Sequence, residues 1–382
     1  MRLQNRLFRL SLHLLAWLIF IPAATPSFLF AQQIHALWGF TADGPFSGST
    51  QQTIAALKDN AINAVFVDRL DPALMKTLRA SGIKIFSTVQ VFGDHSLWKT
   101  YPQLRPVNRE GELAPAKYGS GICPTQRWYW PTILQKISRK AGAGYDGVWL
   151  DFIRFGSFWE EPNPRLQQLC FCDSTLADFS KVTGIAIPAQ VAEADTLAAD
   201  EQNHHSENAD TIRMRPMTTA EKAEWILSNH SVEWTKYKTG VITDFVKLAK
   251  EEIAKRPEKV LGIFSVPWRR NEFGDAIVTV IGQDYAALRD HVDVFSPMLY
   301  HELCGRPLSW IGSFVKHTSN LIKKPVWPII QTDLGKDHLV TDEEFATAVL
   351  NALDPPSKGV IIFRQQTLIE AKQLPTLRAV WK

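Results

Sequence analysis

The sequence predicts an α/β protein built as a single (β/α)8 TIM barrel, and three observations support this prediction. Eight short apolar runs recur along the chain, amphipathic helical stretches separate them, and no glycine-rich phosphate loop follows the first run. Alternating strands and helices are typical of a parallel sheet, and eight such units close a barrel. A doubly wound open sheet is the alternative, but it would normally carry G-x-G-x-x-G where "WGFTADGPFSG" stands here.

The predicted strands and helices can be placed in chain order. The eight apolar runs cover residues 34–40, 61–68, 83–92, 146–152, 260–267, 293–300, 325–331 and 359–365. Among the helices, "STQQTIAALKDN" begins with Ser49 and Thr50 as candidate caps, and "DPALMKTLRASG" ends on Gly82. Pro257 stops "VITDFVKLAKEEIAKRP". Each predicted helix therefore ends just before a strand.

The spacing between the strands is uneven. More than 100 residues separate the fourth and fifth runs. We therefore expect long insertions after strands 3 and 4, on the face that carries the carboxyl ends of the strands. Residues 188–229 are polar and poor in aromatic side chains, which predicts a polar insertion within one domain that spans residues 32–382.

The N-terminus has the pattern of a signal peptide. Arg2, Arg6 and Arg9 precede "LSLHLLAWLIFIP", and "SFLFA" offers a cleavage point after Ala31. We therefore expect residues 1–31 to be removed and the protein to be secreted or periplasmic. An uncleaved anchor is the competing interpretation, but an apolar run of about 13 residues is short for a span that needs about 20, so no stable membrane insertion is expected.

Composition and cysteine pattern narrow the range of partners. A net charge of +3 with scattered basic residues does not indicate nucleic acid as a partner, and the oligomeric state is left open. The four cysteines, Cys123, Cys170, Cys172 and Cys304, suggest disulfides or free structural thiols. Zinc is the rival, but "CFCD" lacks the usual C-x-x-C spacing. No H-x-H or H-E-x-x-H motif occurs on a predicted strand, so we expect neither a metal nor a cofactor.

Candidate site residues are the polar side chains that follow the strands, because active sites of such barrels lie at the carboxyl ends of the strands. Asp151 ends the fourth run, and Glu302 follows the sixth. Alternation along each strand would point both carboxyl groups into the mouth of the barrel. Paired carboxyl groups are what glycoside hydrolysis requires, since one protonates the leaving oxygen and the other attacks the anomeric carbon or activates water. An alternative is that Glu302 is solvated and Asp151 pairs with Arg154.

Other side chains at the strand ends are candidates for binding the substrate. A guanidinium group can hold a carboxylate, aromatic rings stack on sugars, and amides bond to sugar hydroxyl groups. The candidate substrate-binding residues are Arg154, Trp268, Tyr300, His301, Gln331 and Gln365. Each of them also has a purely structural interpretation, as a hydrogen-bonded or packed residue at the strand tips.

Several segments carry a resemblance to a known group of proteins. "DGVWLDFIRF", "CFCDSTLADFSKVTGI", "EWTKYKTGVITDFV" and "DVFSPMLYHE" resemble the glycoside hydrolase-like TIM-barrel families of bacteria. These families are related to the glycosidase domain of bacterial poly-N-acetylglucosamine deacetylases, and the resemblance covers most of residues 34–366. It implies a barrel that acts on a polysaccharide, with Asp151 as a catalytic residue.

A more distant likeness runs to the chitinase-type barrels, whose fourth strand reads D-G-x-D-x-D-x-E. Here Asp146, Gly147 and Asp151 match, Trp149 replaces the middle aspartate, and Ile153 replaces the catalytic glutamate. The chitinase mechanism therefore does not transfer. We expect a secreted glycosidase that cleaves a polysaccharide, and the alternative is a carbohydrate-binding barrel without catalytic activity.

Overall fold

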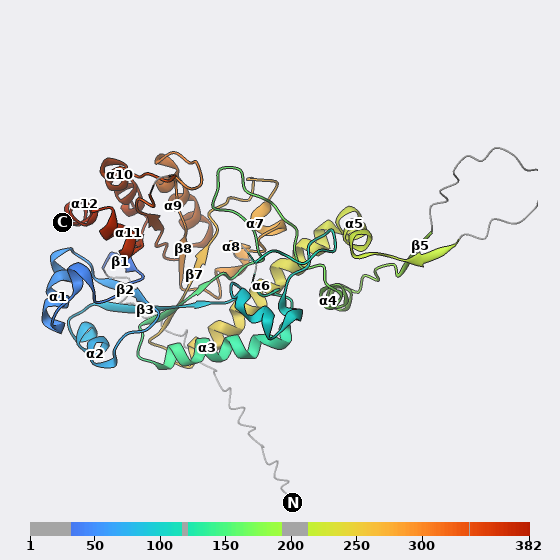
Figure 1. Ribbon diagram of the computed structural model, residues 1–382, viewed down its shortest axis with the longest axis horizontal. Coiled ribbons are helices and arrows are strands. Elements are labelled where there is room, and N and C mark those ends of the chain that lie inside the picture. Colours follow the sequence, from blue (N-terminus) through green and yellow to red (C-terminus); the bar gives the residue numbers. More distant parts are fainter. Residues whose placement is uncertain (1–31, 117–120, 193–212, 336) are drawn as a thin grey trace, which may run out of the picture.

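The computed structural model describes residues 32–116, 121–192, 213–335 and 337–382. Eight parallel strands form one sheet in the order β8-β7-β4-β3-β2-β1-β10-β9 (Figure 1). Isolated parallel bridges from Phe295 to Val326 and from Met298 to Ile329 join β8 to the segment around β9. These bridges bring the two ends of the sheet together, so the predicted (β/α)8 barrel is confirmed.

Each strand of the barrel falls within one of the eight predicted runs. The strands are β1 Ile34–Trp38, β2 Ala64–Val67, β3 Lys84–Gln90, β4 Gly147–Asp151, β7 Val260–Ser265, β8 Val294–Pro297, β9 Ile329–Gln331 and β10 Gly359–Phe363. The predicted runs are longer because they include apolar residues of the adjoining loops. Phe40 and Phe92, for example, are buried although they lie beyond the ends of β1 and β3.

Helices cover the outside of the barrel (Figure 1). They are α1 Thr50–Asp59, α2 Pro72–Ala80, α3 Trp130–Gly142, α4 Asp173–Thr183, α5 Thr219–Asn229, α6 Ser231–Ala254, α7 Ala276–Thr279, α8 Tyr285–Leu288, α9 Ser309–Ile322, α10 Asp342–Leu353, α11 Gln365–Glu370 and α12 Leu374–Trp381. Ser49 caps α1 in a reciprocal capping box with Gln52, as the sequence predicts. No helix among the described residues is long and apolar enough to cross a membrane.

The long insertions follow β3 and β4, as expected. Between β3 and α3, the described residues 91–116 and 121–129 contain short 3-10 helices. After β4 the chain forms α4, a two-stranded antiparallel hairpin of β5 Gln190–Ala192 and β6 Met214–Pro216, and then α5. This part extends away from the barrel beyond α6 (Figure 1). The predicted signal peptide, residues 1–31, and residues 193–212 of the polar insertion lie outside the described residues.

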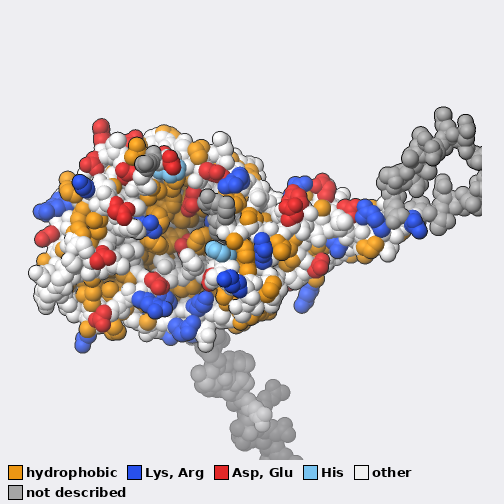
Figure 2. All heavy atoms as spheres, in the orientation of Figure 1, with side chains coloured by type: hydrophobic (Ala, Val, Ile, Leu, Met, Phe, Trp, Pro, Cys, Tyr) orange, Lys and Arg blue, Asp and Glu red, His pale blue; other side chains and the backbone are white. Residues whose placement is uncertain are grey.

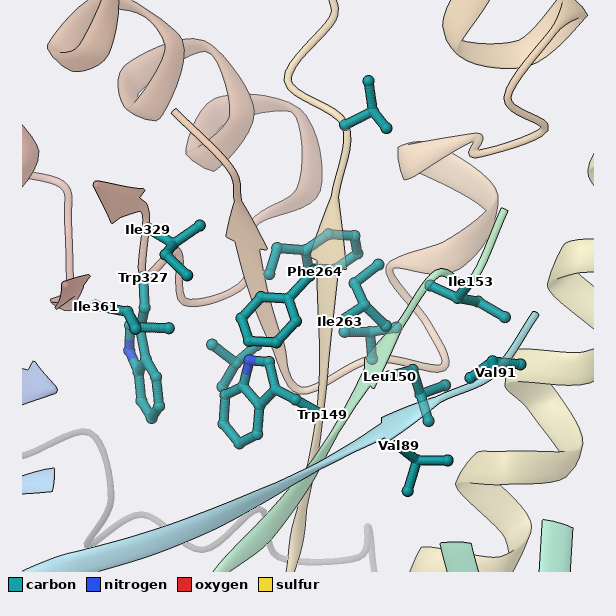
Figure 3. Close-up of a cluster of buried hydrophobic side chains, with 14 of the residues drawn as sticks. Val89, Val91, Trp149, Leu150, Ile153, Ile263, Phe264, Trp327, Ile329 and Ile361 are labelled. Atoms are coloured by element: carbon teal, nitrogen blue, oxygen red, sulfur yellow. The ribbon is translucent and has the colours of Figure 1, made fainter. Parts of the chain in front are cut away.

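Aromatic side chains fill the interior of the barrel. The ring of Trp149 stacks on Trp327 at 5.3 Å and meets Phe86 at 4.7 Å and Phe66 at 5.0 Å. Figure 3 shows Trp149 on the inner side of the strands and its neighbour Leu150 on the opposite side, toward the helices. Because side chains alternate along a strand, Asp151 shares the inner face with Trp149. Asp151 therefore lies next to the packed aromatic side chains on the inner face of β4.

Candidate active site

A cavity of about 760 Å³ opens where the carboxyl ends of the first strands meet. Trp38, Thr88, Gln90 and Asp151 line it, from the ends of β1, β3 and β4. The sheet register places Gln90 directly opposite Asp151, so both side chains lie on the inner face. Figure 2 shows this side of the molecule, with a hollow lined by hydrophobic side chains over the middle of the barrel. A pocket of this size is typical of a small-molecule or sugar site.

Asp151 is the last residue of β4, and its carboxyl group is largely shielded from water. Burial, with a smaller contribution from the negative charge of Glu160, raises its pKa to about 6, although the amide of Phe152 and the charge of Arg154 oppose the shift. The Phe152 amide donates to Oδ1 of Asp151 at 2.8 Å. A carboxyl group with a pKa near 6 can hold a proton near neutral pH, which general acid catalysis requires.

Glu160 is the second carboxyl group near this site, and our sequence analysis missed it. It lies in the loop after β4, where it lines a second cavity of about 430 Å³ together with Arg154, Trp159 and His338. Its side chain reaches solvent, yet the surrounding protein raises its pKa, and the charge of Arg154 opposes that shift. Glu160 lies nine residues beyond the end of β4, so the positions of the strand ends do not indicate it. The stretch "FIRFGSFWEE" nevertheless showed two acids among aromatic residues.

Glu302, the predicted partner of Asp151, has a different neighbour. Its Oε2 lies 2.8 Å from Nδ1 of His338. The side-chain charges that shift the pKa of Asp151 are those of Arg154 and Glu160, and Glu302 is not among them. The pairing of Asp151 with Glu302 stays a prediction, and the geometry offers Glu160 as an alternative.

Arg154 and Tyr300 lie beside the two acids. The buried Arg154 side chain donates to the carbonyl oxygens of Phe155 at 3.2 Å and Ser157 at 3.4 Å. Tyr300 is buried, and its ring stacks on that of Trp159 at 5.8 Å. Burial, together with the charges of Glu160 and Asp151, holds the pKa of Tyr300 well above its usual range. Tyr300 is therefore a neutral aromatic residue that packs against Trp159, which lines the second cavity.

Gln331 and His301, two other predicted residues, line neither of the two cavities at the strand ends. Gln331 is buried, and its Oε1 accepts a hydrogen bond from the Leu303 amide at 3.2 Å, while its Nε2 has no partner among the described residues. His301 is also buried, which lowers its pKa, and within the described chain its Nδ1 is unpaired. Each of these two side chains therefore has one nitrogen that makes no hydrogen bond within the described residues.

Gln365 and Trp268 have framework contacts. The Gln365 amide donates to Thr41 Oγ1 at 3.0 Å and to Asp43 Oδ1 at 2.7 Å, which ties the loop after β1 to the end of β10. Trp268 is buried against Phe273 at 5.0 Å and lines a separate cavity of about 190 Å³. Neither side chain lines the two cavities that contain Asp151 and Glu160.

All four cysteines are free thiols. Cys123 and Cys172 lie near each other, since both contact the hydroxyl group of Thr175, at 3.7 and 3.0 Å. No group of three metal-binding side chains occurs within the part of the chain that the structure describes. Cys123 lies in the segment after β3, Cys170 and Cys172 lie in the segment after β4, and Cys304 lies after β8; none of the four lines either cavity at the strand ends.

The closed sheet of eight parallel strands defines the class of the protein, a (β/α)8 TIM barrel. Residues 48–323 match the model of a protein family described as "Putative glycosyl hydrolase domain". The chain belongs to this family, which confirms the predicted glycosidase class. No match among curated proteins was found.

Solved structures share the fold at low sequence identity. The glycoside hydrolase domain of PgaB (BpsB) from Bordetella bronchiseptica is 12% identical, with a TM-score of 0.61 over 92% of this chain and 99% of that chain. A β-galactosidase from Marinomonas ef1 is 10% identical, with a TM-score of 0.58 over 92% of this chain and 59% of that one. A β-galactosidase from Halorubrum lacusprofundi is 11% identical, with a TM-score of 0.58 over 92% and 57%.

At these identities the likeness concerns the fold. The chain spans less than two thirds of the length of these two β-galactosidase chains.

Proposed function

We propose that this protein is a secreted glycoside hydrolase that cleaves a polysaccharide, with Asp151 as the proton donor and Glu160 as the second catalytic carboxyl group. The observation that carries the proposal is that Asp151 ends β4 and lines the cavity of about 760 Å³, while Glu160, in the loop after β4, lines a second cavity and contributes to the raised pKa of Asp151. Glycoside hydrolysis needs one carboxyl group that can hold a proton and a second that is ionised.

The environments of the two acids suggest separate roles. Asp151 is the more buried group, so it holds a proton near pH 6 and can deliver it to the leaving glycosidic oxygen. Glu160 reaches solvent and is therefore suited to activate the attacking water. The positive charge of Arg154 lowers the pKa of both acids and so favours their charged forms. Its positive charge keeps one of them ionised while the other carries the proton.

A polymeric substrate is supported by the two cavities. Asp151 lines the cavity of about 760 Å³, and Glu160 lines the adjoining one of about 430 Å³, where Phe152 and Arg154 also lie. A sugar chain that enters both cavities would place a glycosidic bond beside the acids. Trp159 lines the cavity that contains Glu160, and Trp38 lines the cavity that contains Asp151, so each cavity has an aromatic ring in its wall.

The test is release of reducing ends from a panel of bacterial and plant polysaccharides. We expect turnover by the wild-type protein on at least one polymer and a loss of at least about 10³-fold in Asp151→Asn, since general acid catalysis and charge stabilisation are both removed. Unchanged turnover in Asp151→Asn would remove this residue from the mechanism. Binding without any release of reducing ends would favour a carbohydrate-binding barrel without catalytic activity.

Secretion is supported by the basic and apolar pattern of residues 1–31. Expression of the full chain in a bacterium, followed by N-terminal sequencing of the protein from the periplasm or medium, tests it. We expect the mature chain to begin at Gln32. Recovery of the intact chain in the membrane fraction would show an uncleaved anchor instead.

A further inference from the structure

We propose that the cavity of about 760 Å³ binds an anionic sugar residue of the substrate through Lys136 and Arg139 of α3. The inference rests on the proposed glycosidase function and adds the class of polymer, an acidic polysaccharide that carries carboxylate or sulfate groups. Nothing in the fold requires such a pair of basic side chains at this place.

The cavity extends from the catalytic face to α3. Its inner end is lined by Asp151, Gln90 and Thr88, and its outer end by Lys136, Arg139 and Lys140. The passage between the two ends is opened by the short strand β2, which ends at Val67 opposite Ser87, whereas β3 continues to Gln90. A sugar chain bound at Asp151 can therefore extend over the end of β2 to the basic side chains.

The acids in the cavity already have partners. Oδ1 of Asp68 lies 3.0 Å from Nζ of Lys140. Oδ1 of Asp94 accepts hydrogen bonds from the amide of Ser96 at 3.1 Å and from its hydroxyl group at 2.6 Å. Within the described residues, Lys136 and Arg139 have neither a hydrogen bond to a side chain nor an ion pair. These two cations are thus available to a ligand.

The helix itself provides no counter-charge for these residues. Lys136 lies three residues before Arg139 and four before Lys140, so the three cations share one face of α3, and the helix "WPTILQKISRKAG" contains no acid. Like charges at these spacings repel each other. The C-terminal end of the helix dipole favours Arg139 and Lys140 in the last turn, but Lys136 lies outside that turn. Basic side chains gather over α3, below the central hollow (Figure 2).

The chemistry of the pair fits a sugar anion. A guanidinium group can form two parallel hydrogen bonds to a carboxylate or sulfate, and an ammonium group adds a point charge. The pair lies at the end of the cavity away from Asp151, so it would hold the substrate equally well before and during bond cleavage. Loss of these charges should therefore raise KM and leave kcat nearly unchanged.

Binding is measured by calorimetry on Asp151→Asn protein, so that hydrolysis does not interfere. The probes are oligogalacturonate, oligomannuronate and heparosan oligosaccharides, each beside its carboxyl-reduced form, together with a sulfated galactan. We expect at least one acidic probe to bind at least 10-fold more tightly than its neutral form. The added change Lys136→Gln with Arg139→Gln should remove that preference, as should 0.5 M salt, because salt screens exposed charges.

The matched control is Lys58→Gln with Lys76→Gln, which removes two exposed cations from α1 and α2 outside the cavity. Binding should be unchanged in this control, and thermal unfolding checks that both pairs of variants fold. Preference for uronates over the sulfated galactan would identify a carboxylate as the ligand, and the reverse a sulfate. Failure of every acidic probe to bind, or equal binding of the neutral forms, overturns the inference.

The two proposals can fail separately. If acid-dependent binding is found but no polymer is cleaved by the wild-type protein, the anion site stands and the hydrolase proposal fails. If a neutral polymer is cleaved with the same KM in the wild-type protein and in the variant that lacks Lys136 and Arg139, the hydrolase stands and the anion site is refuted.

Discussion

The negative charge of Glu160 raises the pKa of Asp151, although Asp151 ends strand β4 and Glu160 lies in the loop beyond it. Arg154 lies within the field of both acids and lowers the pKa of each. The charges of these three residues at the mouth of the barrel therefore influence one another. Changing any one of them should shift the protonation of the others, and this gives the first prediction.

The reaction rate should depend on the protonation of Asp151. With a pKa of about 6, the acid is protonated below that pH, so kcat/KM should fall about tenfold per pH unit above it. Glu160→Gln removes a charge that raises this pKa, so the pKa of Asp151 should fall in the variant. Selective ¹³C labelling of aspartate and an NMR titration measure it directly. An unshifted titration would show that Glu160 does not act on Asp151.

The ionised carboxylate of Asp151 should lower the free energy of unfolding at neutral pH. Its pKa in the folded protein is about 6, above the ordinary value of 3.8. The folded state therefore binds more protons than the unfolded state between these values, and the free energy of unfolding falls as the pH rises from about 4 to 6. At pH 7 the cost is fully present, at up to roughly 3 kcal/mol.

Asp151→Asn should remove this cost, since the amide oxygen can still accept from Phe152. We expect the variant to be more stable than the wild-type protein in urea at pH 7, by up to roughly 3 kcal/mol, and similar to it at pH 4. Asp59→Asn, an exposed change on α1, serves as the control. A wild-type advantage at pH 7 would contradict the raised pKa.

The choice of the second acid can be decided by two matched substitutions. Glu160→Gln should reduce kcat by at least about 10²-fold, because the group that activates water is lost. Glu302→Gln should keep activity within a few fold, because Glu302 is engaged with His338 at 2.8 Å. Both variants are assayed on the best polymer of the panel. The opposite ranking would restore the pairing of Asp151 with Glu302 that the sequence predicts.

The barrel could be predicted from the sequence because each strand is a short apolar run with its own local signal. The same holds for Asp151, since a polar residue that ends a buried strand is visible without knowledge of neighbouring strands. Glu160 lacked such a signal, because a long loop has no periodicity from which the direction of a side chain follows. The position of Glu160 relative to Asp151 depends on the folded conformation of the loop after β4, and the sequence pattern does not give that conformation.

The contacts that individual side chains make could not be predicted from the sequence pattern either. Gln365 follows β10 as a sugar-binding amide would, yet its hydrogen bonds go to Thr41 and Asp43. Trp268 follows β7 but packs on Phe273. Alternation along a strand gives the face of a residue, and it does not give the partners that the loops bring to it. The substrate-binding roles of these residues stay predictions.

The pairing of Trp149 with Gly262 yields the last prediction. A Cβ atom at Gly262 would lie 2.1 Å from Cε2 of Trp149. The indole cannot move aside easily, because its Nε1 donates to Ser296 Oγ at 3.0 Å and its ring is stacked on Trp327. Gly262→Ala should therefore destabilise the protein by about 1–3 kcal/mol through overpacking.

Gly240→Ala is the matched control, since Gly240 lies in α6 and an added Cβ there meets nothing within 4 Å. That change should stabilise the protein by up to about 1 kcal/mol through helix propensity. Urea unfolding of both variants measures the difference. Trp149 precedes Asp151 on the same face of β4, so Gly262→Ala should also lower kcat, whereas Gly240→Ala should not. A Gly262→Ala protein with wild-type stability would show that the barrel interior can be repacked around Trp149.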